Sequence, residues 1–136
     1  MSESSTRAYL RSQLEAHLSA LGYSRPRLSS VRSPVPELVR ISPVRGRMAY
    51  GETILHSDLR LPSCHERLLS FSQRRTRQRS SILFFIGVAA ADEAELDALL
   101  QRLEIRSATR GGHVHVVAIA PAGTRRAATK DRVARE

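Results

Sequence analysis

The sequence predicts one α/β domain, and three of its patterns carry that prediction. Two segments have leucines at helical spacing, a near-continuous apolar run precedes the second of them, and segments of strand-like composition precede that run. The chain has 136 residues, of which 41% are hydrophobic and 26% are charged, so we expect one folded domain rather than a disordered chain. The expected element order is α-β-β-β-α-β-α-β, within residues 1–120.

The first predicted element is an amphipathic helix over residues 5–21. Its leucines recur at i, i+4, i+8 and i+11, which places them on one helix face: Leu10, Leu14, Leu18 and Leu21. Gly22 follows, and glycine suits the left-handed C′ position that ends many helices. Two or three strands are expected next: residues 37–41 and residues 47–55 and, if there are three, residues 27–31 as well.

A second helix is expected after these strands, and it carries the densest basic cluster of the chain. Ser63 and Glu66 have the spacing of a capping box and follow Pro62, so they predict where this helix begins. Its last turns are expected to hold Arg74, Arg75, Arg77 and Arg79. Four arginines within six residues exceed what a helix end requires, so we expect the cluster to bind nucleic-acid phosphates; the alternative is a solvated helix end.

The remaining elements are a strand, a helix and a strand. Residues 81–90 are almost continuously apolar, which is typical of a central strand covered on both faces. Asp92 and Glu95 can cap the next helix, whose apolar face consists of Leu96, Leu99, Leu100 and Leu103. Residues 113–120 are the last predicted strand. Residues 121–136 have no apolar face and predict a basic, disordered tail.

The net charge of +9 is unevenly distributed along the chain. Of the 22 basic residues 21 are arginine, a bias that a GC-rich genome alone would explain. However, residues 25–79 hold twelve basic and four acidic residues, whereas residues 80–120 have a net charge of −2. A guanidinium group also binds phosphate in a bidentate manner. The partner that we expect is therefore nucleic acid, DNA in the first place, and a homodimer is left open.

Other classes of protein are excluded by what the sequence lacks. Cys64 is the only cysteine, so an intrachain disulfide is excluded and a cysteine-based zinc site is not expected. No apolar run approaches the ~20 residues that a membrane-spanning helix needs, and no basic segment followed by an apolar one begins the chain. We expect a cytoplasmic protein that does not contact a membrane.

Two glutamates stand out in the region of the predicted strands. Glu37 follows Pro36 at the start of one strand, and Glu52 lies among apolar residues inside the next. A carboxylate that is buried without a partner costs several kcal/mol, so Glu52 needs a cation, a metal or solvent. Two adjacent strands can bring both carboxylates to one Mg²⁺ ion, which prefers one or two carboxylates together with waters and phosphate oxygens.

This layout resembles the PD-(D/E)XK superfamily, the restriction-endonuclease-like nucleases. Pro36-Glu37 is similar to the acid that follows a proline in that family, and Glu52-Thr53-Ile54 is similar to its (D/E)-x-K triplet. The chain also looks like a set of small bacterial proteins with a Gly-Glu-x-Lys strand, through Gly51-Glu52, Asp58-Leu59, Glu66-Arg67 and Ile82-Leu83-Phe84-Phe85.

The resemblance covers about residues 8–120 and has consequences for fold and function. It implies a mixed sheet flanked by helices. It also implies Glu37 and Glu52 as catalytic residues and as ligands of Mg²⁺, in a nuclease that hydrolyses phosphodiesters.

One position departs from the family pattern, because Ile54 stands where the family has the lysine that orients or activates water. Arg40 or Arg47 can supply a charge but cannot accept a proton. His56 is the third candidate catalytic residue, since alternation places it on the strand face of Glu52 and Ile54 and imidazole titrates near neutral pH. The alternative for His56 is an exposed histidine at a strand end.

Three functions are therefore open. The first is a nucleic-acid-associated protein with a magnesium-dependent nuclease site. The second is a degenerate, non-catalytic protein that kept this fold and binds nucleic acid or a protein partner. The third is an unrelated α/β module whose basic surface reflects genome composition.

Overall fold

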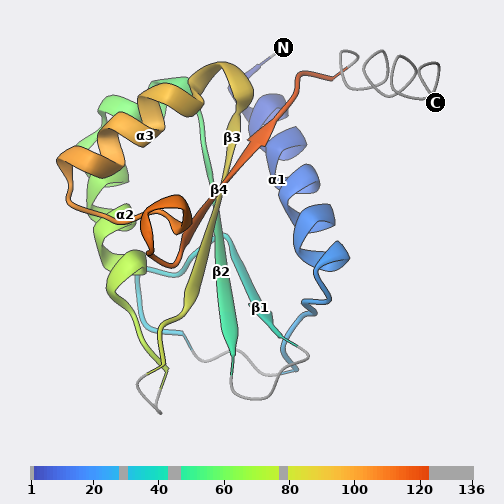
Figure 1. Ribbon diagram of the computed structural model, residues 1–136. Helices are drawn as coiled ribbons and strands as arrows, with labels where there is room; N and C mark the ends of the chain where they lie inside the picture. The colour runs from blue at the N-terminus through green and yellow to red at the C-terminus, as the bar shows by residue number, and fades with distance from the viewer. Residues whose placement is uncertain (1, 28–30, 43–46, 77–79, 123–136) are drawn as a thin grey trace, which may run out of the picture.

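A four-stranded mixed sheet forms the centre of the computed structural model, which describes residues 2–27, 31–42, 47–76 and 80–122 (Figure 1). The strands lie in chain order across the sheet: β1 Leu38–Ile41, β2 Met48–Ile54, β3 Leu83–Ala89 and β4 Val114–Ile119. β1 is antiparallel to β2, whereas β2, β3 and β4 are mutually parallel. The predicted α/β class with a mixed sheet flanked by helices is therefore confirmed.

Helices cover both faces of this sheet (Figure 1). α1 (Glu3–Ala20) packs against one face, and α2 (Pro62–Gln73) and α3 (Glu93–Arg102) pack against the other. Short 3-10 helices complete the described elements: η1 His56–Arg60, η2 Ala90–Asp92 and η3 Ala108–Arg110. No helix of the described residues is long and apolar enough to cross a membrane.

The sheet alternates its side chains between two apolar layers. Phe84 and Ile86 of β3 point toward α2 and α3, and Phe85 points toward α1, where it meets Leu14 and Leu18. α1 approaches so closely that a Cβ atom on Gly51 would lie 3.0 Å from Leu38 and 3.2 Å from Leu14. The closeness of α1 matters for function, because it brings the first turns of that helix to the edge of β2.

The predicted end of the first helix is confirmed. Gly22 has φ +92°, in the left-handed region that suits glycine. Its N–H donates to the carbonyl of Ser19, and the Tyr23 N–H donates to the carbonyl of Leu18. These two bonds form a Schellman motif, which satisfies carbonyls that the helix itself leaves unpaired.

The strand expected at 27–31 falls mostly on residues outside the described part of the chain. Among the described residues, β1 and β2 precede α2, and Ser24 forms an isolated bridge with Ile41. The carbonyls of Arg32, Pro34 and Val35 accept hydrogen bonds from arginines of α2 and its C-cap. Residues 28–30 lie outside the described part of the chain.

The second helix begins and ends differently from the prediction. Leu61 is its N-cap and Pro62 its first residue, because proline needs no N–H partner there and its fixed φ suits a helix start. The expected capping box of Ser63 and Glu66 is therefore not formed. The helix ends at Gln73, before the arginine cluster, and Arg74 has extended backbone with ψ 148°. The predicted tail falls mostly on residues 123–136, which lie outside the described part of the chain.

Candidate functional site

The structure brings Glu37 and Glu52 together at the point where β1 and β2 separate. Leu38 pairs with Gly51 in the sheet register, so Glu37 lies beside Glu52, one residue beyond the pairing. The Glu37 N–H donates to Glu52 Oε2 at 2.6 Å. Both glutamates line one pocket with a volume of about 290 Å³. Two carboxylates from adjacent strands thus face a common space.

The Glu37 carboxylate is held by the edge of β2 and by α1. Its Oε1 atom accepts hydrogen bonds from the Thr53 N–H at 2.8 Å and from Thr53 Oγ1 at 2.7 Å. Its Oε2 atom accepts from Arg11 Nε at 3.0 Å. β1 begins only at Leu38, so the Thr53 N–H has no strand partner at this position and the carboxylate takes its place.

The Glu52 carboxylate is almost completely buried, with 6% of the residue exposed. Arg67 of α2 donates from Nε to Glu52 Oε1 at 2.8 Å. Burial raises the pKa of Glu52 because it disfavours the charged form, while the bonds from Arg67 and from the Glu37 N–H lower it in part. The bond to Glu52 in turn raises the pKa of Arg67. Glu52 is thus the buried member of an ion pair whose other member, Arg67, is partly exposed.

Three arginines surround the two glutamates. Arg7 and Arg11 lie one turn apart on α1, and Arg67 approaches from α2 on the other face of the sheet. Arg7 forms an ion pair with Asp58 at 2.7 Å and lies 3.7 Å from Glu37 Oε1. The pocket therefore contains three carboxylates and three guanidinium groups, and its formal charge is balanced.

Sequence reasoning did not identify Arg7, Arg11 or Thr53. A signal for the arginines is present in the sequence, since Arg7 and Arg11 repeat at i and i+4 beside the buried Leu10 and Leu14. That spacing predicts a shared helix side, but which strand edge the side meets depends on how α1 packs. Arg67 appeared in the sequence resemblance, although without the role that its bond to Glu52 gives it.

Arg67 donates a hydrogen bond to Glu52, the acidic residue of the triplet Glu52-Thr53-Ile54. Ile54 lines the same pocket but brings no charge. Arg40 donates to the carbonyl of Val39 and to Glu15, so it is engaged elsewhere. Arg47 precedes β2 and is exposed; five residues of extended chain, roughly 16 Å, separate it from Glu52. The basic side chain that contacts Glu52 is therefore Arg67 of α2, and not a residue of β2.

His56 is not brought into this pocket. β2 ends at Ile54, so the alternation that would have carried His56 to the Glu52 face stops, and His56 begins η1. Its Nδ1 atom lies 2.9 Å from Asp92 Oδ1, and 62% of its side chain is exposed. It lines a separate pocket of about 190 Å³ with Glu3 and Ser57. His56 is therefore an exposed histidine near the end of a strand, as the alternative interpretation of the sequence predicted.

The predicted arginine cluster is divided by the structure. Arg74 is 8% exposed, and it donates to the carbonyls of Arg32 and Pro34 at 3.0 and 2.8 Å. Its guanidinium also lies 5.0 Å from the centre of the Phe71 ring. Arg75 is exposed. Arg77 and Arg79 lie outside the described residues. Arg74 therefore supports the fold, and Arg75 is the cluster member that the structure places at the surface.

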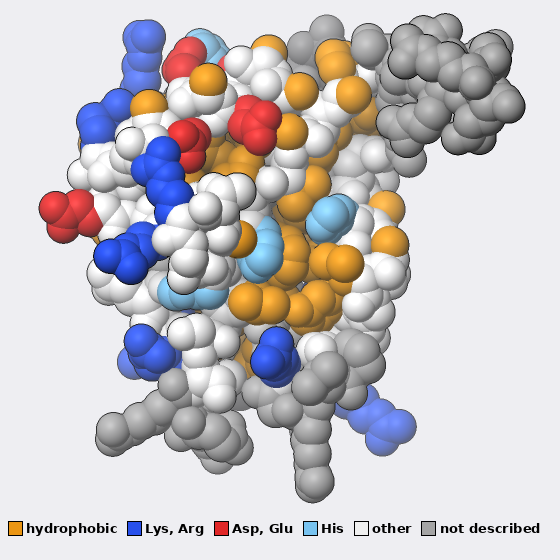
Figure 2. Space-filling model, viewed as in Figure 1, with side chains coloured by type: hydrophobic (Ala, Val, Ile, Leu, Met, Phe, Trp, Pro, Cys, Tyr) orange, Lys and Arg blue, Asp and Glu red, His pale blue; other side chains and the backbone are white. Residues whose placement is uncertain are grey.

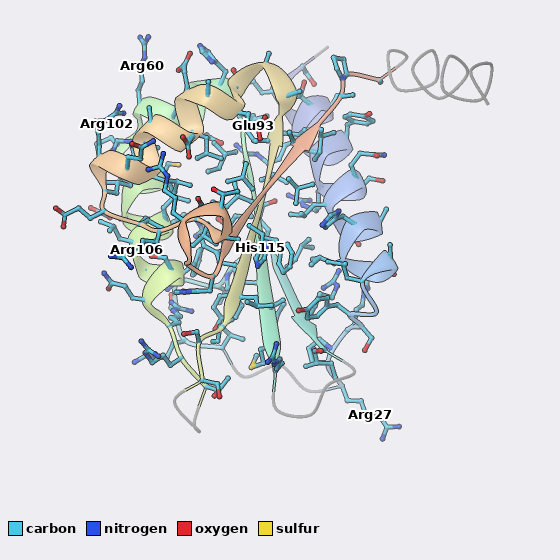
Figure 3. The ribbon with its side chains drawn as sticks, in the orientation of Figure 1. Arg27, Arg60, Glu93, Arg102, Arg106 and His115 are labelled. Atoms are coloured by element: carbon cyan, nitrogen blue, oxygen red, sulfur yellow. The ribbon has the colours of Figure 1, made fainter. Side chains whose placement is uncertain are left out.

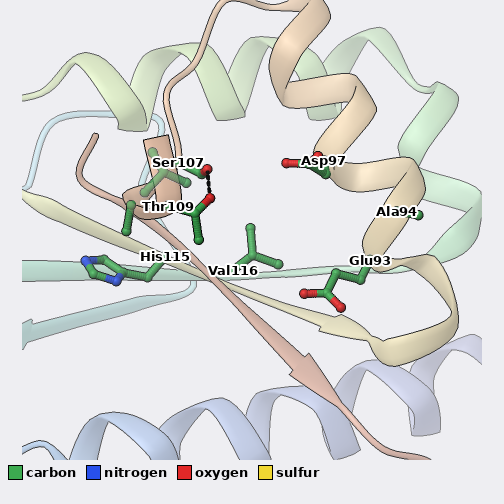
Figure 4. Close-up of a pocket in the computed structure, with 9 residues that line it drawn as sticks. Glu93, Ala94, Asp97, Ser107, Thr109, His115 and Val116 are labelled. Carbon is green, nitrogen blue, oxygen red and sulfur yellow. Dashed lines mark hydrogen bonds between the residues drawn. The ribbon is translucent and has the colours of Figure 1, made fainter. Parts of the chain in front are cut away.

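Another pocket, of about 470 Å³, lies beside β4 and differs in its chemistry (Figure 4). Glu93 and Asp97 of α3 line it, together with Ser107 and Thr109, whose hydroxyl groups are 2.9 Å apart. None of the described residues that line it is an arginine, and on the face shown in Figure 2 basic side chains appear as separate spots. This pocket is unsuited to a polyanion, and none of the site residues predicted from sequence lines it.

The pocket of Glu37 and Glu52 offers two carboxylates as oxygen donors. Among the described residues, no cluster of three or more histidine, cysteine or acidic side chains could hold a metal. Mg²⁺ requires only one or two carboxylates, because waters and phosphate oxygens complete its coordination. Each of the four carboxylate oxygens already accepts a hydrogen bond. A carboxylate oxygen that accepts one hydrogen bond keeps a second lone pair for an ion, but Arg11 and Arg67 place positive charge against two of these oxygens.

Comparisons with protein-family models, with curated proteins and with solved structures find no match to this chain.

Proposed function

We propose that this protein binds nucleic acid and hydrolyses its phosphodiester bonds with Mg²⁺ held by Glu37 and Glu52. One observation carries the proposal: two carboxylates from adjacent strands and three guanidinium groups line the same pocket. Carboxylate oxygens suit the metal, and guanidinium groups suit the phosphate that accompanies it. These five side chains would thus bind both the metal ion and the phosphodiester that coordinates it.

The ion pairs of the pocket can be exchanged for contacts with metal and phosphate. A phosphate would attract Arg11 and Arg67 away from the carboxylates, and the carboxylate oxygens would then be available to the cation. When bound, Mg²⁺ polarises a phosphodiester and lowers the pKa of a bound water. Arg67, which stays protonated, would stabilise negative charge on the phosphate but would not accept a proton from water.

Nuclease assays on the purified protein test this proposal. We expect single- or double-stranded DNA or RNA to be cleaved with Mg²⁺ or Mn²⁺ and to remain intact with EDTA. Glu37→Ala and Glu52→Gln should each reduce the cleavage rate by at least about a hundredfold, since each removes a metal ligand. Glu66→Ala is the matched control, because Glu66 is an exposed carboxylate on the same side of the sheet as Arg67. Cleavage that survives both site substitutions would refute the assignment of the site.

The second candidate function is a non-catalytic nucleic-acid-binding protein. Two observations favour it: Ile54 replaces the family's lysine, and all four carboxylate oxygens have protein donors. Salt-sensitive binding of DNA or RNA without cleavage of any substrate would support this candidate. Absence of binding even at low salt would contradict both candidates and favour a basic surface set by composition.

A further inference from the structure

A basic pocket lies at the C-terminal end of α2, next to the site described above. Its volume is about 530 Å³, and the described residues that line it are basic or neutral and polar: Arg32, Ser33, Ser70, Gln73, Arg74 and Arg75. Guanidinium groups, hydroxyl groups and an amide are the side-chain donors with which proteins bind nucleic-acid phosphates. None of these described lining residues carries a carboxylate, unlike the balanced pocket of Glu37 and Glu52.

The buried side chain of Arg74 holds together the two segments that form the pocket. Its buried guanidinium fixes the segment of Arg32 and Pro34 to the end of α2 through two carbonyls, and it lies 3.4 Å from Ser70 Oγ. The exposed residues Arg32 and Arg75 line the pocket, one from each of these two segments. The Arg75 guanidinium also donates to Ser81 Oγ at 3.4 Å, at the long end of hydrogen-bond distance.

The same segment connects the basic pocket to the two glutamates. Arg67, which binds Glu52, also donates to the carbonyl of Val35 at 3.1 Å, two residues before Glu37. Arg67 and Arg74 both lie 5.0 Å from the centre of the Phe71 ring, so one aromatic side chain joins the two pockets. Both pockets therefore lie within reach of one nucleic-acid strand.

We propose that the pocket of Arg32 and Arg75 binds a backbone phosphate of the nucleic acid, on the same strand as the phosphate at Glu37 and Glu52. This inference rests on the proposed function in one respect, since the ligand is a nucleic-acid strand. It does not require catalysis, and it applies equally to the non-catalytic candidate. The sequence predicted a phosphate-binding cluster of arginines that follow one another closely in the chain. The proposed site instead consists of Arg32 and Arg75, which come from separate segments, with the buried Arg74 between them.

Fluorescence anisotropy of a labelled 20-base-pair DNA duplex, titrated with the full-length protein in EDTA over a series of salt concentrations, tests this inference. The double variant Arg32→Ala/Arg75→Ala should lose roughly ten- to hundredfold in affinity at 0.1 M salt, and its slope of log K against log salt should become shallower by about 1 to 2. The matched control is Arg102→Ala/Arg106→Ala, which removes the same charge from exposed arginines on the α3 side (Figure 3).

The outcomes separate the inference from the proposed function. If both double variants lose affinity and slope equally, the protein binds DNA through its general charge, and the basic pocket is refuted while the proposed function stands. If the native protein does not bind the duplex at 50 mM salt, both are refuted. Because all four substituted arginines are exposed, we expect both variants to unfold at the same urea concentration as the native protein.

Discussion

At the scale of single residues, Glu52 is the side chain whose environment is most demanding. It is a buried carboxylate in a strand between apolar neighbours, and its compensation comes from one guanidinium and one backbone N–H. Its raised pKa shows that these two donors do not fully offset the loss of water. A buried carboxylate lowers the free energy of unfolding, and a role in binding would explain why a carboxylate occupies this position.

The raised pKa of Glu52 gives stability a specific pH dependence. The folded state holds the Glu52 proton more tightly than the unfolded chain does, so this stabilising contribution is complete below about pH 4.5 and is lost as the pH rises through the raised pKa. We therefore expect the free energy of unfolding of the native protein to fall, relative to that of Glu52→Gln, as the pH rises above about 4.5. Urea denaturation of both proteins at each pH measures this difference.

A control and a contrary result define this test. Glu66→Gln should show no such pH-dependent difference, because Glu66 is exposed. A native protein that instead gains stability relative to Glu52→Gln as the pH rises would mean that the ion pair with Arg67 outweighs burial. The stated direction of the pKa shift would then be wrong.

At the scale of elements, α2 acts as a support for the segment that leads to Glu37. Arg67, Phe71 and Arg74 lie on one side of the helix and its C-cap, with the aromatic ring between the two guanidinium groups. Together the arginines donate to three carbonyls within residues 32–35. This explains how a segment without regular secondary structure delivers a carboxylate to a fixed place.

Replacement of Arg74 should destabilise the whole domain. Arg74→Ala leaves the carbonyls of Arg32 and Pro34 unpaired and removes the contact with the Phe71 ring, so we expect a loss of about 2–4 kcal/mol in the free energy of unfolding. Urea denaturation measures this loss. Arg60→Ala, which removes an exposed arginine, should change stability by less than about 0.5 kcal/mol. Equal stability of the two variants would show that Arg74 does not hold the segment.

At the scale of the whole molecule, the positive charge is unevenly distributed. The net charge of +9 is concentrated in residues 25–79, and these residues provide Glu37, Glu52, Arg67 and the basic pocket. The acidic residues of α3 lie on another part of the molecule, beside β4 (Figure 4). A polyanion would therefore be attracted to the α2 side rather than to the molecule as a whole.

Binding of a nucleic acid should depend strongly on salt. If the two pockets together engage about three or four phosphates, log K should fall with log salt with a slope of roughly −3, and affinity should drop by about fiftyfold or more between 50 and 200 mM salt. Titrations of a DNA duplex at four salt concentrations measure the slope. A slope near zero would contradict binding through phosphate contacts.

Much of the fold was predictable from the sequence because apolar spacing has few alternative explanations. The leucines of α1 and α3, the glycine after α1 and the apolar run of β3 lie where the periodicity predicts. The boundaries of α2 were predicted incorrectly, and the strand expected at 27–31 falls mostly outside the described residues. Side-chain bonds from Arg67 and Arg74 fix the carbonyls of residues 32–35, and no local pattern encodes such bonds.

By itself, the sequence determined the α/β class, the two glutamates and the uneven positive charge, because these follow from local periodicity and composition. Only the tertiary structure decided which cations meet the glutamates, that His56 pairs with Asp92, and that Arg74 is buried while Arg32 joins Arg75. The physical reason is that these contacts join α1, β2, α2 and the segment before β1. Their geometry is fixed by how helices pack on the sheet, which spacing along the chain does not specify.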